Sequence, residues 1–186
     1  MKKALIAIIS AIYVVAIIIV AFLGSRADIY NRTVYAEEIV LLNENIVNPD
    51  TGDVAIEVYK RPEESHIDPD TGIDDIEGIN WNYGEKKDQK RDYAIFVYDT
   101  NFLYDTMGKT YALKTSVKPD DTTKKDLEYF IAGGDKVVST LSINNVGEIS
   151  FSVEYTSWVD VDVFVSTTDL SNVEIDILLK INKYKH

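Results

Sequence analysis

The stretch that decides the fold lies near the C-terminus and reads Trp158-Val159-Asp160-Val161-Asp162-Val163-Phe164-Val165-Ser166. Every second residue from position 159 to position 165 is valine. Side chains of a β-strand point alternately to the two sides of the sheet, so this period of two predicts a strand with one buried side. Asp160 and Asp162 are then expected on the side that faces solvent.

Both neighbouring segments have the same alternation. Residues 148–155 and 173–182 carry an apolar side chain at every second position: Ile149, Phe151, Val153 and Tyr155, then Val173, Ile175, Ile177 and Leu179. Further strands are predicted at residues 93–98, 110–117, 127–131 and 137–143. Residues 144–147, Asn-Asn-Val-Gly, predict a hairpin turn, because Asn and Gly tolerate positive φ. The sequence therefore predicts a mainly β fold, an immunoglobulin-like antiparallel β-sandwich over residues 93–186.

Residues 28–92 are predicted to hold a neck, additional strands and a long loop. Residues 53–60 alternate as a half-buried strand, with Val54, Ile56 and Val58 on one face, whereas residues 38–42 fit a strand or a short helix. Residues 61–92 are rich in Pro, Gly and charge, which is typical of an excursion. Within it Trp81 and Tyr83 either dock on the body or stand exposed as binding aromatics. It stays open whether residues 30–61 join the main sandwich.

The N-terminal part, residues 1–27, contains the strongest single signal. Residues 4–23 form an uncharged run of 20 residues, which as a helix is about 30 Å long, the thickness of a bilayer core. Lys2 and Lys3 precede it, so the positive-inside rule predicts a single-pass anchor in the cell membrane with a cytoplasmic N-terminus and an extracytoplasmic body. The alternative is a cleaved signal peptide, for which residues 25–27, Ser-Arg-Ala, would be a poor cleavage site.

Composition excludes several classes of partner and site. The net charge is −12, and all 31 acidic residues follow the apolar run, so the body repels nucleic acid. The chain has no Cys, which excludes disulfides, thiolate nucleophiles and zinc-thiolate sites. An exported domain of this size without disulfides is typical of a bacterial surface protein.

Three motifs follow one another in an order known from one family: Met-Gly-Lys-Thr-Tyr-Ala-Leu at 107–113, Val-Lys-Pro-Asp-Asp-Thr-Thr at 117–123 and Asn-Asn-Val-Gly-Glu-Ile-Ser at 144–150. Over about residues 93–183 the chain resembles the bacterial immunoglobulin-like group 2 domain family. It departs from the family at Tyr129, where members usually carry Trp, and it lacks their Gly before the penultimate strand. The resemblance implies a spacer or adhesive module of bacterial and phage surface proteins, without catalytic residues.

One acidic loop is a candidate metal site. Residues 68–77 hold five carboxylates, of which Asp68, Asp70, Asp74 and Asp75 are the candidate ligands for Ca²⁺, a cation that takes six to eight oxygens. Gly72 stands at the fifth loop position rather than the sixth, and Pro69 stiffens the start. We therefore expect millimolar affinity at best. The alternative is a pair of solvated acidic β-turns, since Pro-Asp-Thr-Gly also occurs at residues 49–52.

Catalytic residues are scarce. The two histidines, His66 and His186, lie in no motif with a nucleophile or metal ligand, so we expect no enzyme and no cofactor other than weakly bound Ca²⁺. The sequence favours an adhesive, envelope-structural or protein-docking role, with a protein or envelope component as partner. The alternatives are a calcium-assisted ligand or carbohydrate-binding module and an accessory subunit of a membrane complex.

Overall fold

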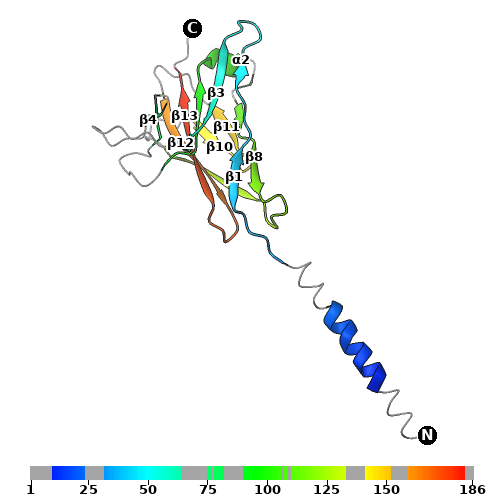
Figure 1. Cartoon of the computed structure of the whole chain (residues 1–186). Coiled ribbons are helices and arrows are strands. Elements are labelled where there is room, and N and C mark those ends of the chain that lie inside the picture. Colours follow the sequence, from blue (N-terminus) through cyan, green and yellow to red (C-terminus); the bar gives the residue numbers. More distant parts are fainter. Residues whose placement is uncertain are drawn as a thin grey trace, which may run out of the picture. The chain divides into compact units, whose positions relative to one another are not determined.

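The computed structural model describes residues 10–23, 32–63, 75–76, 78–81, 90–105, 107–108, 110–132, 141–151 and 159–182. The chain divides into two compact units, Met1–Val34 and Tyr35–His186. In the first unit residues 10–23 form a helix, and the second unit is mainly β (Figure 1). Within the described residues, no helix is both long enough and apolar enough to cross a membrane.

The largest sheet has six strands in the order β2-β3-β6-β13-β12-β9. Its strands are β2 (Ile46–Val47), β3 (Val54–Lys60), β6 (Tyr93–Val97), β9 (Leu127–Ala132), β12 (Val159–Thr167) and β13 (Glu174–Ile181). The prediction of a wholly antiparallel fold is wrong at one pair, because β6 and β13 run parallel. The remaining neighbours are antiparallel. A parallel pair needs a long connection between its strands, and here the chain from 98 to 173 supplies it.

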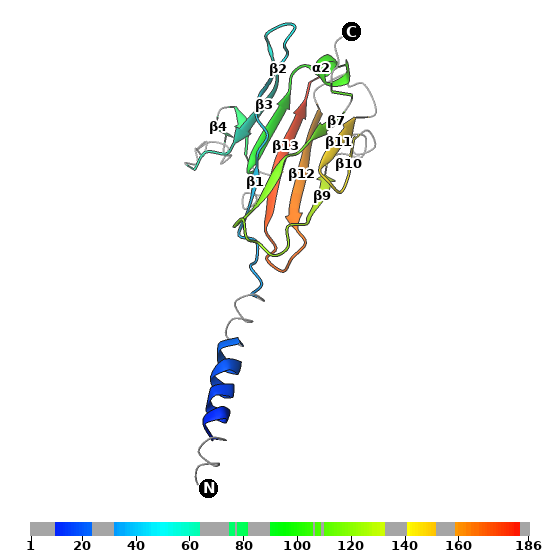
Figure 2. The same ribbon diagram turned by 90° about the vertical axis from the view of Figure 1, so that its right-hand side faces the viewer.

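A second layer is made of two smaller sheets. One pairs β1 (Glu38–Leu41) with β8 (Thr115–Lys118), and the other has the order β10-β11-β7, with β10 at Leu141–Ile143, β11 at Glu148–Phe151 and β7 at Thr110–Ala112. Figure 1 places β12 and β13 on one side of the body and β1 and β8 on the other, and Figure 2 looks onto the layers after a quarter turn.

The predicted strand at residues 110–117 is divided between the two smaller sheets. The Leu113 N–H donates to the Gly147 carbonyl at 2.9 Å, beside β11, whereas the Lys114 carbonyl accepts from the Leu42 N–H at 2.7 Å, beside β1. Successive residues of a strand direct their polar groups to opposite edges. One extended segment therefore pairs first with β11 along one edge and then with β1 along the other.

The sequence left open whether residues 30–61 join the main sandwich, and the strand pairing answers this question. β1 is a strand rather than a helix and pairs with β8, and β3 pairs with β6 inside the six-stranded sheet. Both are thus part of the same β unit. The predicted facing of β3 holds only in part: Ala55 is as fully buried as Ile56, and Val54 is exposed at the strand's start.

The main core lies between the two layers. Ile39, Tyr111 and Ile149 of the second layer belong to one apolar cluster with Val163 and Ile177 of the six-stranded sheet. The alternation predicted for β12 is confirmed at Val161, Val163 and Val165, which are all buried. Each such side chain contributes about 1.5–3 kcal/mol when it is fully buried.

A short helix, α2 (Thr100–Asp105), was not predicted. Asp99 precedes it, and the Phe102 N–H donates to the Asp99 Oδ1 at 2.9 Å, which is an N-cap bond. The helix places Phe102 and Leu103 in the main core, so these two apolar residues are what hold it there.

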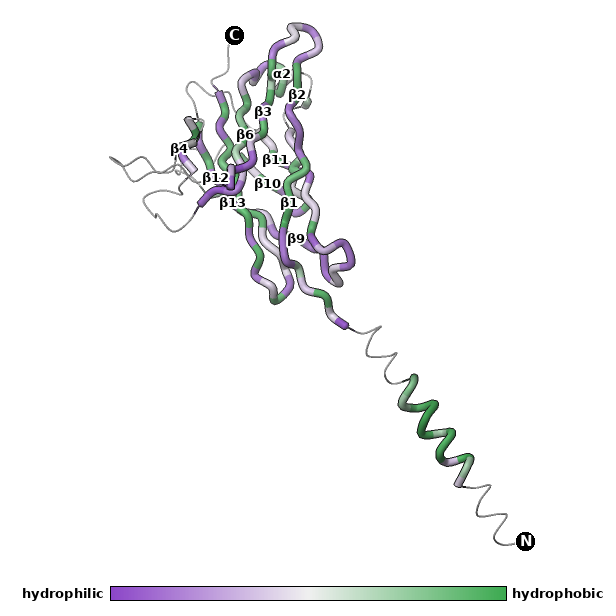
Figure 3. Tube along the Cα trace, viewed as in Figure 1, coloured by the Kyte–Doolittle hydropathy of each residue, from purple (hydrophilic) through white to green (hydrophobic). Residues whose placement is uncertain are grey.

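The helix at residues 10–23 differs from every strand in its hydropathy. Figure 3 shows it as almost continuously hydrophobic, whereas hydrophobic and hydrophilic residues alternate along much of the β unit. Large apolar side chains lie exposed around its circumference, among them Ile12, Val14, Ile17 and Val20.

Candidate functional site

A second apolar cluster lies on the face of the six-stranded sheet that points away from the main core. It consists of Ile79, Trp81, Ala94 and Leu178, with Tyr59 and Phe96 packed against it. Ile79 belongs to a hairpin of two short strands, β4 (Asp75–Ile76) and β5 (Ile79–Asn80), and Trp81 follows directly. Trp81 is fully buried, so of the two alternatives left open for it, docking on the body is confirmed.

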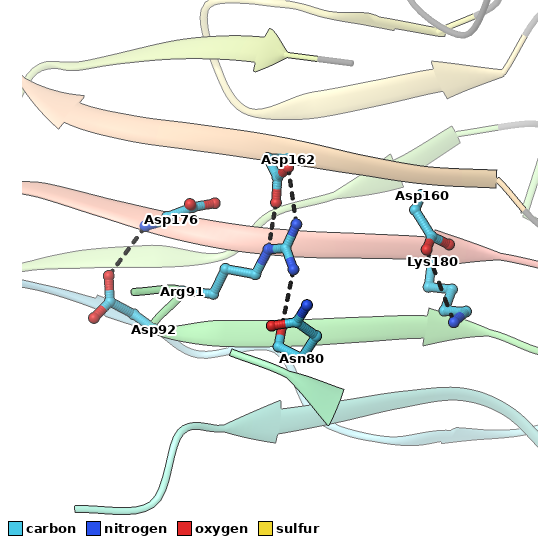
Figure 4. A network of polar contacts seen from close by, with 7 residues as sticks. All are labelled: Asn80, Arg91, Asp92, Asp160, Asp162, Asp176 and Lys180. Atoms are coloured by element: carbon cyan, nitrogen blue, oxygen red, sulfur yellow. Dashed lines mark hydrogen bonds and ion pairs between the residues drawn. The ribbon is translucent and has the colours of Figure 1, made fainter. Parts of the chain in front are cut away.

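Arg91 joins this hairpin to the sheet. Its Nε donates to the Asp162 Oδ1 at 2.6 Å and its Nη2 to the Asp162 Oδ2 at 3.1 Å, while its Nη1 donates to the Asn80 carbonyl at 2.8 Å (Figure 4). The Arg91 N–H also donates to the Trp81 carbonyl at 2.8 Å. A two-bonded arginine–carboxylate pair fixes orientation as well as charge. Arg91 therefore ties β12 to the covering hairpin at one point.

The expectation that Asp162 faces solvent is wrong. The Asp162 side chain is 14% exposed and that of Arg91 12%, because the hairpin covers this part of the sheet. Asp160, two residues earlier on the same side of β12, is 55% exposed, as expected, and lies 3.8 Å from the Lys180 Nζ. The difference between the two aspartates comes from the hairpin, since alternation gives both the same facing.

Asp176 is the most deeply buried carboxyl of a charged network that Arg91, Asp92, Asp162 and Asp176 form (Figure 4). The residue is 7% exposed, and its Oδ1 has no hydrogen-bond partner among the described residues. Burial, and to a smaller extent the Asp162 carboxylate, raise the pKa of Asp176 to about 7, whereas the charge of Arg91 opposes this shift. Protonated Asp176 avoids an unpaired buried charge, so this carboxyl titrates near neutrality.

Asp92 links the network to the backbone of β13. Its carboxylate Oδ2 accepts the Asp176 N–H at 3.1 Å, and its own N–H donates to the Asp176 carbonyl at 2.8 Å (Figure 4). Burial raises the pKa of the Asp92 carboxyl, and the bond from the Asp176 N–H and the charge of Arg61 oppose that rise. The Arg61 Nη2 lies 3.9 Å from the Asp92 Oδ1.

The chemistry open to this network is structural ion pairing and binding of a proton. Across the described ranges, no three acidic or histidine side chains are placed to share a metal ion. Arg91 is held by Asp162 and by the Asn80 carbonyl, so its planar group is already used in joining two parts of the fold. Arg91, Asp92, Asp162 and Asp176 therefore form a charged network that joins the hairpin to the sheet, and we call this network the charged clasp.

The residues that the sequence singled out for calcium mostly lie outside the described part of the chain. This holds for Asp68, Asp70 and Asp74, and Asp75 is described only by its backbone, which pairs with Asn80 at the start of β4. The calcium site stays a prediction. His66, Tyr83, Trp158 and His186 also lie outside the described residues.

Sequence reasoning missed the association of Arg91, Asp162 and Asp176. A single Asp between Ile175 and Ile177 looks like the solvent side of an alternating strand, and Arg91 looks like the end of a basic cluster. The one usable signal was Trp81, because a large aromatic in a polar loop needs a surface to cover.

Comparisons place the chain beside no known protein. No family model, no curated protein and no solved structure matches it.

Proposed function

We propose that the chain is a single-pass protein of a bacterial cell membrane, with its N-terminus in the cytoplasm, and that its extracytoplasmic β unit holds another protein or an envelope component without catalysing a reaction. The helix at residues 10–23 carries this proposal. Its apolar side chains are exposed on every side, and a helix that is hydrophobic all round needs an apolar surrounding. The uncharged run continues to residue 4, which makes it long enough for a bilayer.

The proposed role of the β unit is to dock. We infer an immunoglobulin-like sandwich related to the bacterial group 2 domains, and the two layers around one core and the hairpin at residues 144–147 support this inference. The Asn144 Oδ1 accepts the N–H groups of Val146 and Glu148 at 3.1 and 2.9 Å, and Gly147 has φ of 79°, as such a turn requires. A non-catalytic role is supported by the clasp, whose charged groups bind one another.

Cell fractionation tests the anchor. We expect the full chain in the membrane fraction, resistant to carbonate extraction, and a mature N-terminus that still contains the apolar run. Changing Val14 and Ile18 to Arg should release the chain or block its insertion, because each arginine costs about 2.5–3.5 kcal/mol at a helix centre. The matched control is Leu170→Arg, at an exposed position of the β unit. A soluble wild-type chain that begins at Asp28 would contradict the proposal.

A further inference from the structure

One edge of the segment that contains β7 and β8 is paired over its first half, and over its second half it has no partner strand among the described residues. The Leu113 N–H donates to the Gly147 carbonyl, so the polar groups of Leu113 face the side of β11. In an antiparallel ladder this direction alternates, so Thr115 and Val117 face the same side, while Lys114 and Ser116 face β1. β11 begins only at Glu148, and no described strand pairs with the edge at Thr115 and Val117.

A second open edge lies on β9, the last strand of the six-stranded sheet. The Thr168 N–H donates to the Asp126 carbonyl at 3.2 Å, which fixes Asp126 as a residue that faces β12. By the same alternation, Leu127 and Tyr129 direct their N–H and carbonyl groups away from β12. Two strand edges, one from each layer, thus have polar backbone groups that pair with no other strand among the described residues.

A groove of about 540 Å³ lies between these edges, lined by residues 113–117 and 125–127 together with Tyr129, Asn145 and Val146. A hydrogen bond of 3.0 Å joins the Tyr129 Oη to the Thr115 Oγ1, so the Tyr129 side chain spans from β9 to β8. Leu127 and the largely exposed Val146 add apolar side chains to a lining that is otherwise mostly polar. β8 is four residues long, so its open edge extends about 13 Å, enough to pair with a short strand.

The charge of the groove is opposite to that of the chain. Lys114 and Lys125 line it with a single carboxylate, Asp126, whereas the whole chain carries −12. Opposite charges across an interface favour association and suppress unsuitable partners. An acidic segment therefore fits this groove better than a basic one.

We propose that the groove between β8 and β9 accepts an extended acidic segment of a partner protein as an added β-strand, hydrogen-bonded to the backbone of Thr115 and Val117. The added strand continues the line of β11 beyond the turn at residues 144–147. In such strand addition the main-chain bonds supply affinity and the alternate side chains supply specificity. An open strand edge is the template that this mode of binding uses. The inference rests on the docking role proposed above and names the class of partner.

The test uses the full chain in detergent micelles and a fluorescent peptide of alternating Glu and Val. A peptide of about seven residues is roughly 23 Å long at about 3.3 Å per residue, which is more than enough to cover the four residues of β8. We expect the peptide to bind and to slow hydrogen exchange at the amides of Thr115 and Val117, with no change at Ser116. The same peptide with Lys in place of Glu, or with methylated backbone nitrogens on the edge that meets β8, should bind at least about tenfold more weakly.

Charge reversal in the protein provides the second arm. Lys114→Glu with Lys125→Glu should weaken binding about tenfold, which equals about 1.4 kcal/mol. The control Lys60→Glu, on β3 and outside the groove, should change it less than about twofold. Both lysines of the groove are exposed, so the melting temperature should stay close to wild type.

Three results would overturn the strand-acceptor proposal: no binding of the acidic peptide, equal binding of the lysine or methylated peptide, or exchange protection at other residues. Concentration-dependent protection of Thr115 and Val117 in the absence of peptide would instead assign the groove to a second copy of this chain. None of these results bears on the anchor, which the fractionation tests separately.

Discussion

The outer face of the six-stranded sheet and the groove between β8 and β9 present the same physical problem and solve it differently. Both combine apolar side chains with polar groups that need partners. On the outer face the hairpin supplies them, because Trp81 covers the apolar part and the Asn80 carbonyl accepts from Arg91. In the groove no described strand pairs with the edge at Thr115 and Val117. The chain thus covers the first surface itself, and this contrast supports the proposal that the second surface receives a partner.

The largest effect on stability is expected in the main core. It sets the scale for the effects expected at the outer face of the sheet and at the groove. Val161→Asp places a charge without a partner in the buried side of β12 and should lower the free energy of unfolding by about 5 kcal/mol or prevent folding. Asp160→Asn, one residue away on the exposed side, should change it by less than about 0.5 kcal/mol. Urea denaturation of both variants measures the difference, and similar effects would mean that the facing of β12 is wrong.

Removing the aromatic cover of the outer face should have the next largest effect. Trp81→Ala deletes a fully buried indole and should lower the free energy of unfolding by about 3–4 kcal/mol. Val146→Ala, at the exposed end of the groove, is the matched truncation and should cost less than about 0.5 kcal/mol. Thermal melts report the two values. Equal costs at both positions would remove the contrast between a closed face and an open groove.

A smaller, pH-dependent effect is expected from Asp176. In the unfolded chain a carboxyl has a pKa of about 3.9, whereas burial raises the pKa of Asp176 to about 7. Between these values the folded chain binds more protons than the unfolded chain, so the free energy of unfolding falls as the pH rises from about 4 to about 7. The loss is complete about one pH unit above the raised pKa, near pH 8.

Asp176→Asn should abolish this fall. At pH 8 the variant should be more stable than wild type by about 1–2 kcal/mol, and near pH 4 the two should be equally stable. The full difference between the folded and unfolded pKa values would correspond to roughly 4 kcal/mol, and screening by solvent reduces it. For a unit of this size the gain corresponds to a melting temperature about 2–8 °C higher. Asp160→Asn controls for the loss of one charge. An Asp176→Asn variant that is less stable than wild type at pH 8 would show that the ionised carboxylate has a partner.

The elements that the sequence predicted correctly are those that depend on local patterns, above all the alternation of apolar and polar residues along a strand. The strands β11, β12 and β13 and the turn at residues 144–147 were predicted close to where they lie, because a period of two and the Asn and Gly of a turn act locally. The docking of Trp81 was one of two alternatives that the sequence left open, and its complete burial decides between them.

The rest depends on contacts between residues far apart in the chain. Arg91 and Asp162 are 71 residues apart, and only the hairpin makes their pairing a buried one. The parallel pairing of β6 with β13 and the division of residues 110–118 between two sheets follow from which edge each strand meets, which no local pattern encodes. The open groove is a consequence of that division.

The central claim, that the edge of β8 beside the groove is unpaired, is tested most directly by amide hydrogen exchange of the chain without any ligand. Ser116 lies opposite Val40 in the ladder with β1, whereas Thr115 and Val117 face the groove. We expect the Ser116 amide to exchange slowly and the amides of Thr115 and Val117 to exchange at rates close to those of exposed loops. Slow exchange at all three amides in dilute solution would show that the edge is already covered, and it would contradict the account.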